Sequence, residues 1–277
     1  MKQVFYGSCE LEKCFDITAL YTAFTKTFQK GEGSSGEFHN FWELVVVIDG
    51  TLTVATGKGI FSIKKNSMIL HPPMAFHRHL NEEDVPLTFL VLTFDAKQMP
   101  IEKDSVYVLD AEEVKECRDI LNLIYEKYFI ERQLIVTRPK VPGDFSGQEV
   151  KSRLELFFVN VCSGKMVSRK NVNFEYQQIV RFIKENLTRN LTLADMASAL
   201  CMSTSKLKKV FSGYSGMGVI TYYNRCRMKL AYQLLEQGHF VREVAELLEY
   251  SSQSAFCTAF KNTLGFPPSK VRKDSVD

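Results

Sequence analysis

The spacing of hydrophobic and polar positions changes along the chain, and the changes divide it into regions. Residues 38–95 are rich in β-branched and aromatic residues and are interrupted by short turn sequences such as "IDG" and "TGKG". Apolar runs that are this short and closely spaced are typical of antiparallel strands. The pattern predicts that the N-terminal part of the chain is an all-β unit, either a sandwich or a barrel.

Two segments that follow have apolar residues at helical spacing, at residues 111–133 and 149–161. The apolar stripe of the first segment consists of Val114, Cys117, Leu121, Ile124 and Tyr128. A stripe wider than one barrel can cover tends to bind a second copy of the chain. We therefore expect residues 111–162 to form a helical dimerisation segment.

Residues 163–173, "SGKMVSRKNVN", show neither the spacing of apolar residues expected for a helix nor that expected for a strand, and we expect them to be a linker. Helical patterns dominate from residue 174 onward. The predicted organisation is α+β: a β-barrel domain at 1–110, the dimerisation helices, the linker, and an all-helical domain at 174–277.

Two stretches of the helical region repeat each other at an offset of 48 to 49 residues. Each copy has a small alanine in its first helix, a hydroxyl residue suited to cap the second helix, and a glycine that ends it. The matched pairs are Ala197 with Ala245, Leu200 with Leu248, Ser203 with Ser251, Phe211 with Phe260, and Gly216 with Gly265. These features predict two helix-turn-helix units, at about 192–213 and 240–264, joined by a long helix.

The net charge of +3 is unevenly distributed along the chain. Residues 174–277 carry 14 Lys and Arg against 9 Asp and Glu, whereas the acids outnumber the bases in the remainder. Residues 203–235 contain six basic residues and no acidic one: Lys206, Lys208, Lys209, Arg225, Arg227 and Lys229. This excess favours an anionic partner, and the helix-turn-helix pattern makes double-stranded DNA the expected one.

The last hundred residues resemble the DNA-binding domain of the AraC/XylS family of bacterial transcription regulators. The resemblance rests on "LADMASALCMSTSKLKKVF", "YYNRCRMKLA" and "FCTAFKNTLGFPPSKVRK". It implies a ligand-responsive, sequence-specific regulator that acts as a homodimer, with RNA polymerase as a further candidate partner. By position it implies that the groove-facing residues are Ser205, Lys206, Lys208 and Lys209 in the first unit and Gln253, Cys257, Thr258 and Lys261 in the second.

The chain departs from the family pattern in both turns. Members of the family usually have glycine where this chain has Cys201 and Glu249. If these turns need a left-handed backbone, each substitution costs roughly 1 to 2 kcal/mol. We also expect the carboxylate of Glu249 to lie near phosphate, so that the second unit binds DNA either more weakly or more selectively than the first.

The N-terminal sequences "FHNFWELVVVIDGTLTV" and "KKNSMILHPPMAFHRHL" resemble a cupin-like sensor barrel. Residues 37, 39 and 43 share parity, so an interior cluster of their side chains is geometrically feasible. The resemblance implies a ligand pocket for a small-molecule effector at His39, Trp42, Glu43 and His77.

Two other functions fit the same residues. Two histidines and a carboxylate suit Fe(II) or another divalent metal, so the chain could be a metal-dependent cupin enzyme attached to a DNA-binding module. Alternatively, it could be a constitutive regulator whose barrel only dimerises. We expect hydrogen-bonded pocket residues instead, with no catalysis, metal or cofactor. The effector, the operator and the choice between activation and repression are not identified.

The remaining features concern location. No stretch resembles a signal peptide or a membrane span, and the seven cysteines have no disulfide or zinc-site spacing. We therefore expect a cytoplasmic protein with reduced thiols.

Overall fold

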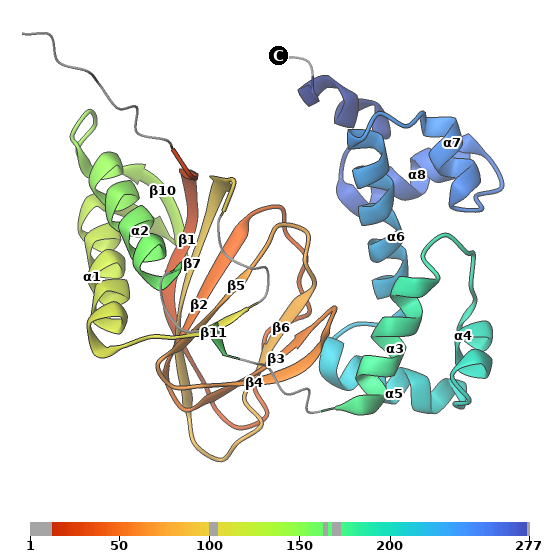
Figure 1. Ribbon diagram of the computed structural model, residues 1–277, viewed down its shortest axis with the longest axis horizontal. Coiled ribbons are helices and arrows are strands. Elements are labelled where there is room, and N and C mark those ends of the chain that lie inside the picture. The colour runs from red at the N-terminus through yellow and green to blue at the C-terminus, as the bar shows by residue number, and fades with distance from the viewer. Residues whose placement is uncertain (1–12, 100–104, 163–165, 168–172, 276–277) are drawn as a thin grey trace, which may run out of the picture.

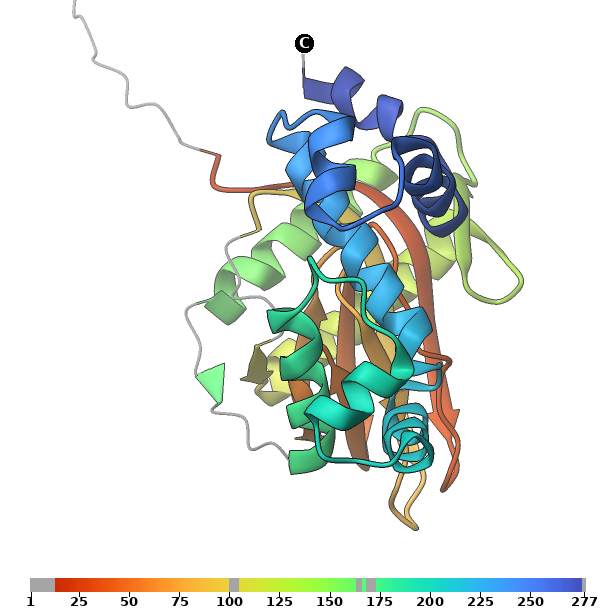
Figure 2. The same cartoon turned by 90° about the vertical axis from the view of Figure 1, so that its right-hand side faces the viewer.

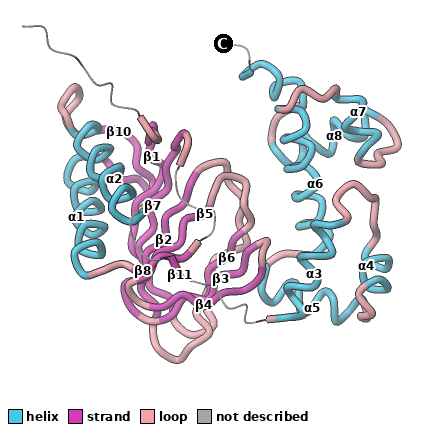
Figure 3. The backbone as a smooth tube through the Cα atoms, in the orientation of Figure 1, coloured by secondary structure: helices cyan, strands magenta, loops and turns pink. Residues whose placement is uncertain are grey.

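The computed structural model of the protein describes residues 13–99, 105–162, 166–167 and 173–275. A β domain with two covering helices is followed by a helical domain (Figure 1). Figure 3 shows the strands between the two covering helices and the helical domain. The α+β organisation predicted from the sequence is confirmed at this level.

The described residues of the β domain form two antiparallel sheets and not one continuous closed barrel. The larger has the strand order β11-β8-β5-β2-β7-β1-β10-β9, and the smaller has the order β4-β3-β6. The strands are β1 (Asp16–Phe28), β2 (Trp42–Asp49), β3 (Thr51–Thr56), β4 (Gly59–Lys64), β5 (Ser67–His71), β6 (His77–Leu80), β7 (Leu87–Lys97), β8 (Val106–Val108), β9 (Tyr128–Glu131), β10 (Ile135–Pro139) and β11 (Met166–Val167).

Strand β2 shows how the alternation of side chains separates two cores. Trp42, Leu44 and Val46 belong to a core shared with the helices α1 (Ala111–Lys127) and α2 (Ser146–Cys162). The next residue in each case points to the opposite face, and Val45 belongs to the core between the two sheets. Glu43 lies on that inner face and is buried.

The helix predicted over residues 111–133 ends at Lys127, and the hairpin β9–β10 follows. Tyr128 already has an extended backbone, and Arg132 and Gln133 have the positive φ of a tight turn. Val114, Cys117, Leu121 and Ile124 are buried against the larger sheet and α2 of the same chain. The expectation that this stripe binds a second copy is therefore wrong for these four residues.

Five of the described strands lie outside residues 38–95, the segment predicted to be β: β1, β8, β9, β10 and β11. Strand β1 precedes it and pairs with β7 along its whole length. Strand β11 lies within the predicted linker and pairs with β8, which brings this part of the chain onto the larger sheet. The other residues of the predicted linker, apart from Asn173, fall outside the described part of the chain.

The helical domain contains the predicted repeat. Its elements are α3 (Phe174–Glu185), α4 (Leu193–Ala199), α5 (Thr204–Ser215), α6 (Val219–Glu236), α7 (Val241–Leu247), α8 (Gln253–Leu264) and the 3-10 helix η1 (Pro268–Ser275). Ala197 and Ala245 are buried between the helices of their units, as expected from their small size. Helix α6, about 27 Å long at 1.5 Å per residue, carries one unit at each end (Figure 2).

The first helix-turn-helix unit shares its core with the β domain. Ala55, Ile60 and Phe76 of the β domain are buried in one cluster with residues of α3, α5 and α6. The backbone carbonyl of Gly213, at the end of α5, accepts a hydrogen bond of 2.7 Å from Arg78. The β domain therefore packs directly on one of the two units.

Candidate DNA-binding surface and ligand cavity

Helix α5 has the amphipathic form of a recognition helix. Its N-cap is Ser203, as predicted, and the Ser203 hydroxyl accepts a hydrogen bond of 3.1 Å from the backbone N–H of Lys206. Leu207 and Phe211 are buried, whereas Ser205, Lys206, Lys208 and Lys209 are exposed. Lys206 also forms an ion pair of 2.5 Å with Glu175 of α3. Lys208 and Lys209 therefore provide the exposed positive charge of this helix.

Helix α8 presents mainly uncharged groups. Its N-cap is Ser252, one residue after the predicted Ser251, and the Ser252 side chain accepts from the N–H of Ala255. Gln253, Thr258 and Lys261 are exposed and Cys257 is partly buried. The Thr258 hydroxyl donates to the carbonyl of Ser254 in the preceding turn. Gln253 and Lys261 thus carry the longest exposed polar side chains among the predicted contacts of α8.

Both turns have the left-handed backbone that the missing glycines suggested. Cys201 has φ of 53° and Glu249 has φ of 51°. The carboxylate of Glu249 accepts a hydrogen bond of 2.8 Å from the backbone N–H of Asn190, in the loop before α4. Glu249 therefore links the second unit to the first, a role that its position in the repeat did not predict.

Arg227 belongs to the basic run in the sequence, but it is buried inside the domain. Its Nε donates to the carbonyl of Leu187 at 3.2 Å, and its guanidinium also donates to the carbonyl of Leu248. The guanidinium lies over the rings of Tyr223 and Tyr250. Since its donors face backbone carbonyls of both units, Arg227 joins them rather than contributing charge to the surface.

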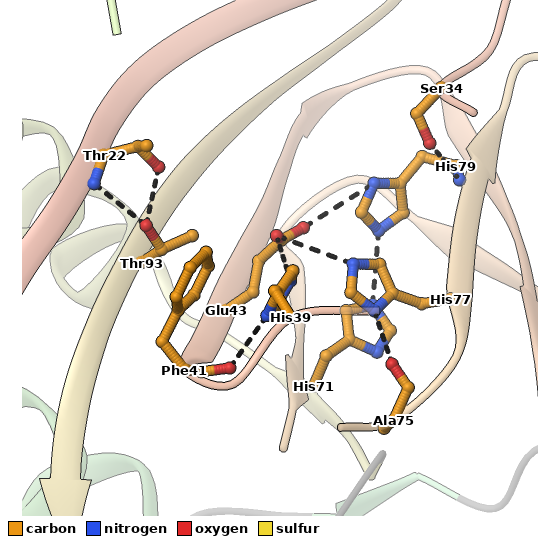
Figure 4. Close-up of polar contacts among 10 residues, drawn as sticks. All are labelled: Thr22, Ser34, His39, Phe41, Glu43, His71, Ala75, His77, His79 and Thr93. Atoms are coloured by element: carbon orange, nitrogen blue, oxygen red, sulfur yellow. Dashed lines mark hydrogen bonds and ion pairs between the residues drawn. The ribbon is translucent and has the colours of Figure 1, made fainter. Parts of the chain in front are cut away.

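A second candidate site lies between the two sheets of the β domain, where four histidines surround one buried carboxylate (Figure 4). His39 Nε2 lies 3.1 Å from Glu43 Oε2, His77 Nε2 lies 3.6 Å from the same oxygen, and His79 Nδ1 lies 3.8 Å from Oε1. His71 Nε2 lies 3.2 Å from His79 Nε2. His71 and His79, which have no motif spacing in the sequence, complete the cluster.

The cluster has strongly perturbed protonation equilibria. Burial alone would raise the pKa of Glu43, but the charge of His77 and the hydrogen bond from His39 outweigh burial and hold this pKa well below its usual range. Burial would lower the pKa of His77, but the charge of Glu43 outweighs it and raises the pKa. Burial holds the pKa of His79 well below its usual range. The favoured state pairs an ionised Glu43 with a protonated His77.

The same residues fit a divalent metal ion. His39, Glu43 and His77 each offer one ligand atom, and these three atoms lie within 4.8 Å of one another. His77 Nε2 is buried and has no hydrogen-bond partner among the described residues. Two imidazoles and a carboxylate are a donor set that suits Fe(II) and related transition metals.

A cavity of about 500 Å³ opens beside the cluster. Among the residues that line it are His39, Glu43, His79, Thr93 and Arg132. Trp42, predicted to be in the pocket, lies on the opposite face of β2, where its Nε1 donates to the carbonyl of Ala96 at 3.3 Å. Of the four predicted pocket residues, His39 and Glu43 thus line the cavity, His77 lies behind them against Glu43, and Trp42 lies on the other face of the strand.

The described helices include none that is long and apolar enough to cross a membrane.

A family model described as a helix-turn-helix domain matches residues 196–274. The chain is 32% identical over 102 residues to an uncharacterised HTH-type transcriptional regulator, YidL, of Escherichia coli, covering 36% of this chain and 34% of that protein. It is 37% identical over 86 residues to a putative AraC-like transcription regulator of Streptomyces lividans, covering 31% and 28%.

These matches span about a third of the length of the curated relatives. Among solved structures, ToxT of Vibrio cholerae aligns with a TM-score of 0.35 and 17% identity, covering 91% of this chain and 97% of that one. The similarity to curated regulators is confined to the C-terminal part of the chain, which contains the two helix-turn-helix units. The helix-turn-helix domain at the C-terminal end of this chain is therefore similar to the DNA-binding domain of AraC-like transcription regulators.

Proposed function

We propose that the protein is a ligand-responsive regulator of transcription that binds double-stranded DNA at specific sequences. The observation that carries the proposal is the pair of exposed recognition helices, α5 and α8, held at the two ends of α6. Two recognition helices on one rigid connector can enter successive major-groove segments about 10 base pairs apart. Arg227 and Glu249 support this reading because both tie the two units together.

The test of DNA recognition is selection from a library of random duplexes with the full chain, followed by binding titrations on the enriched duplex. We expect enrichment of two short sequence elements separated by about one helical turn. Substitution of both Lys209 and Gln253 by alanine should abolish the enrichment. A library that shows no enrichment, with weak binding to all duplexes alike, would contradict sequence-specific recognition.

We propose that the effector binds in the cavity between the two sheets. A volume of about 500 Å³ lies in the range of small-molecule sites, and a few polar groups converge on it from one side. Selective binding to the folded chain must raise its melting temperature. A thermal-shift screen against a metabolite panel should therefore give hits that are lost in His39→Ala. A panel without any such hit would favour the constitutive regulator instead.

A bound divalent metal is a second candidate for this site, because three ligand atoms are already close together and one of them, His77 Nε2, has no hydrogen-bond partner in the described part of the chain. His39, Glu43 and His77 would hold the ion, which would supply positive charge to the buried carboxylate and a coordination position for an anionic effector. Metal analysis of the purified protein, with His77→Ala as control, tests this candidate. The homologues are regulators, so we propose binding and not catalysis.

We also propose that the chain forms a homodimer. Leu156 and Val159 of α2 are 60% and 51% exposed, which leaves an apolar face on the helix that follows α1. We propose that this face, and not the buried stripe of α1, pairs with a second copy of the chain. Contact with RNA polymerase and a cytoplasmic location remain predictions.

A further inference from the structure

Two paired segments, 36–39 and 76–79, separate the β-domain cavity from the helical domain. Glu37 and His77 pair as an antiparallel bridge, with the N–H of Glu37 donating to the carbonyl of His77 at 2.9 Å and the reverse bond at 3.2 Å. These two paired segments are called the wall below.

Side chains alternate across this wall, as expected for extended backbone. On one side, His39, His77 and His79 surround Glu43 (Figure 4). On the other side, Phe38 and Phe76 pack on Tyr222 of α6, with ring centroids 5.8 Å and 5.0 Å from it. Within these segments, Glu37, His39 and His79 line the cavity, and each is next in sequence to Phe38 or Arg78, which contact the helical domain.

Polar and backbone contacts strengthen the helical-domain side. Arg78 donates through Nε to the carbonyl of Ser34 at 2.8 Å and through Nη1 to the carbonyl of Gly213 at 2.7 Å. The guanidinium of Arg225 lies over the ring of Phe38. A Cβ atom at Gly36 would lie 2.0 Å from the carbonyl oxygen of Ser215, so only glycine permits the backbone to approach this closely.

The contacted segment, residues 213–218, comprises the last residues of the first recognition helix and the turn that joins it to the connector α6. Gly216 in this turn has φ of 68° and ends α5, and the Ser215 hydroxyl donates to the carbonyl of Met217. A shift of the wall would therefore move the point that sets the direction of α5 relative to α6. Packed interfaces of this kind tend to switch between discrete arrangements instead of deforming continuously.

We propose that the wall formed by residues 36–39 and 76–79 transmits the state of the cavity to the first recognition helix, with Phe38 as the coupling residue. This inference rests on the proposed effector function of the cavity and specifies how the effector acts. A ligand that moves His39 also moves its neighbour Phe38, and with it the packing on Tyr222. The effect on DNA binding is then a population shift between docked and displaced arrangements of the helical domain.

Hydrogen–deuterium exchange of the full-length protein tests the coupling without a known effector. His39→Ala changes the cavity side of the wall, and we expect exchange in residues 212–219 to accelerate by about fivefold or more, the lower end of typical coupling between sites. Thr93→Val is the matched control, because Thr93 lines the same cavity from β7 and lies outside the wall. Exchange in β7 should stay unchanged in His39→Ala, which shows that the β domain remains folded.

A double-mutant cycle assigns the coupling to Phe38. Phe38→Ala should accelerate exchange in residues 212–219, Phe38→Leu should restore slow exchange, and His39→Ala should add nothing in the Phe38→Ala background. Additive effects of the two substitutions, or no effect of His39→Ala on these residues, would overturn the proposal. Loss of binding to every duplex in a parallel titration would instead contradict the proposed DNA-binding function, because the exchange measurement does not depend on DNA.

Discussion

The carboxylate of Glu249 accepts a hydrogen bond of 2.8 Å from the backbone N–H of Asn190, 59 positions earlier in the chain. Glu249 occupies the left-handed turn of the second helix-turn-helix unit, and Asn190 lies just before the first helix of the first unit. Glu249 therefore adopts a strained backbone conformation in the second unit and makes a hydrogen bond to the first. Cys201, at the equivalent turn of the first unit, has the same backbone conformation, with φ of 53°.

This difference predicts unequal effects of restoring glycine in the two turns. Cys201→Gly should raise the free energy of unfolding by about 0.5 to 1 kcal/mol, because relief of the left-handed strain exceeds the entropic cost of glycine. Glu249→Gly should give a smaller gain or a loss, because it also removes the bond to Asn190. Denaturant unfolding followed by circular dichroism measures both, with Glu249→Gln as the control that keeps the acceptor. Equal gains would mean that the bond to Asn190 contributes nothing.

A further prediction concerns the docking of the β domain on the first unit. Gly36→Ala should weaken this docking, since its Cβ would lie 2.0 Å from the carbonyl oxygen of Ser215. Gly213→Ala is the matched control, because a Cβ at Gly213 meets nothing within 4 Å. Small-angle scattering should show a larger radius of gyration for Gly36→Ala than for the wild type and for Gly213→Ala. An unchanged radius in Gly36→Ala would contradict the close packing of the two domains.

Elements defined by local pattern could be predicted from the sequence. The alanines Ala197 and Ala245 and the cap Ser203 are local signals, and each has its predicted role. The second cap differs by one residue because Ser251 and Ser252 have the same capping chemistry, so composition could not choose between them. The helix over residues 111–127 was predictable, whereas its end at Lys127 depends on the pairing of β10 with β1.

Features defined by distant contacts could not be predicted. His71 and His79 lie near Glu43 only because β5 and β6 flank the same interior, and no sequence spacing encodes this arrangement. Trp42 and Glu43 are adjacent in sequence and face opposite sides of β2, so the pocket prediction needed the register of the strand. Arg227 is indistinguishable from a surface cation until the carbonyls around it are known.

The burial of the α1 stripe changes what a charge introduced there should do. Ile124 is fully buried inside its own chain. Ile124→Glu should therefore destabilise the fold by about 4 kcal/mol or more, because an unpaired charge would be buried. Leu156→Glu with Val159→Glu should leave the melting temperature nearly unchanged and convert dimers to monomers in analytical ultracentrifugation. A folded dimer of this double variant would show that the exposed face of α2 is not the interface.

The cluster around Glu43 predicts a pH dependence of stability in chelator-treated protein. Burial opposes the charge of His77, but the nearby Glu43 raises the pKa of His77 above its unfolded value of about 6.5. The stabilisation from this pairing is complete below that value and is lost as the pH rises through the raised folded pKa. The stability advantage of the wild type over His77→Gln should thus be greatest near about pH 6 and decline toward about pH 9. A difference that stays constant over this range in denaturant titrations would contradict the pairing.

The unequal chemistry of α5 and α8 predicts that the two recognition helices contribute differently to DNA binding. Lys209 is an exposed cation on α5, whereas Gln253 is an exposed amide in the first turn of α8. If Lys209 neutralises a phosphate, Lys209→Ala should reduce the magnitude of the slope of log K against log salt by about 0.9 and weaken binding to all sequences alike. If the amide of Gln253 pairs with adenine, Gln253→Ala should lower affinity for the selected duplex by about 1 to 3 kcal/mol, with an unchanged salt slope and relaxed preference at one base pair.

Titrations at several salt concentrations on selected and scrambled duplexes measure both effects, and Lys206→Ala is a useful comparison because Lys206 is paired with Glu175. Equal weakening of the selected and scrambled duplexes by Gln253→Ala would show that α8 does not read bases through this residue.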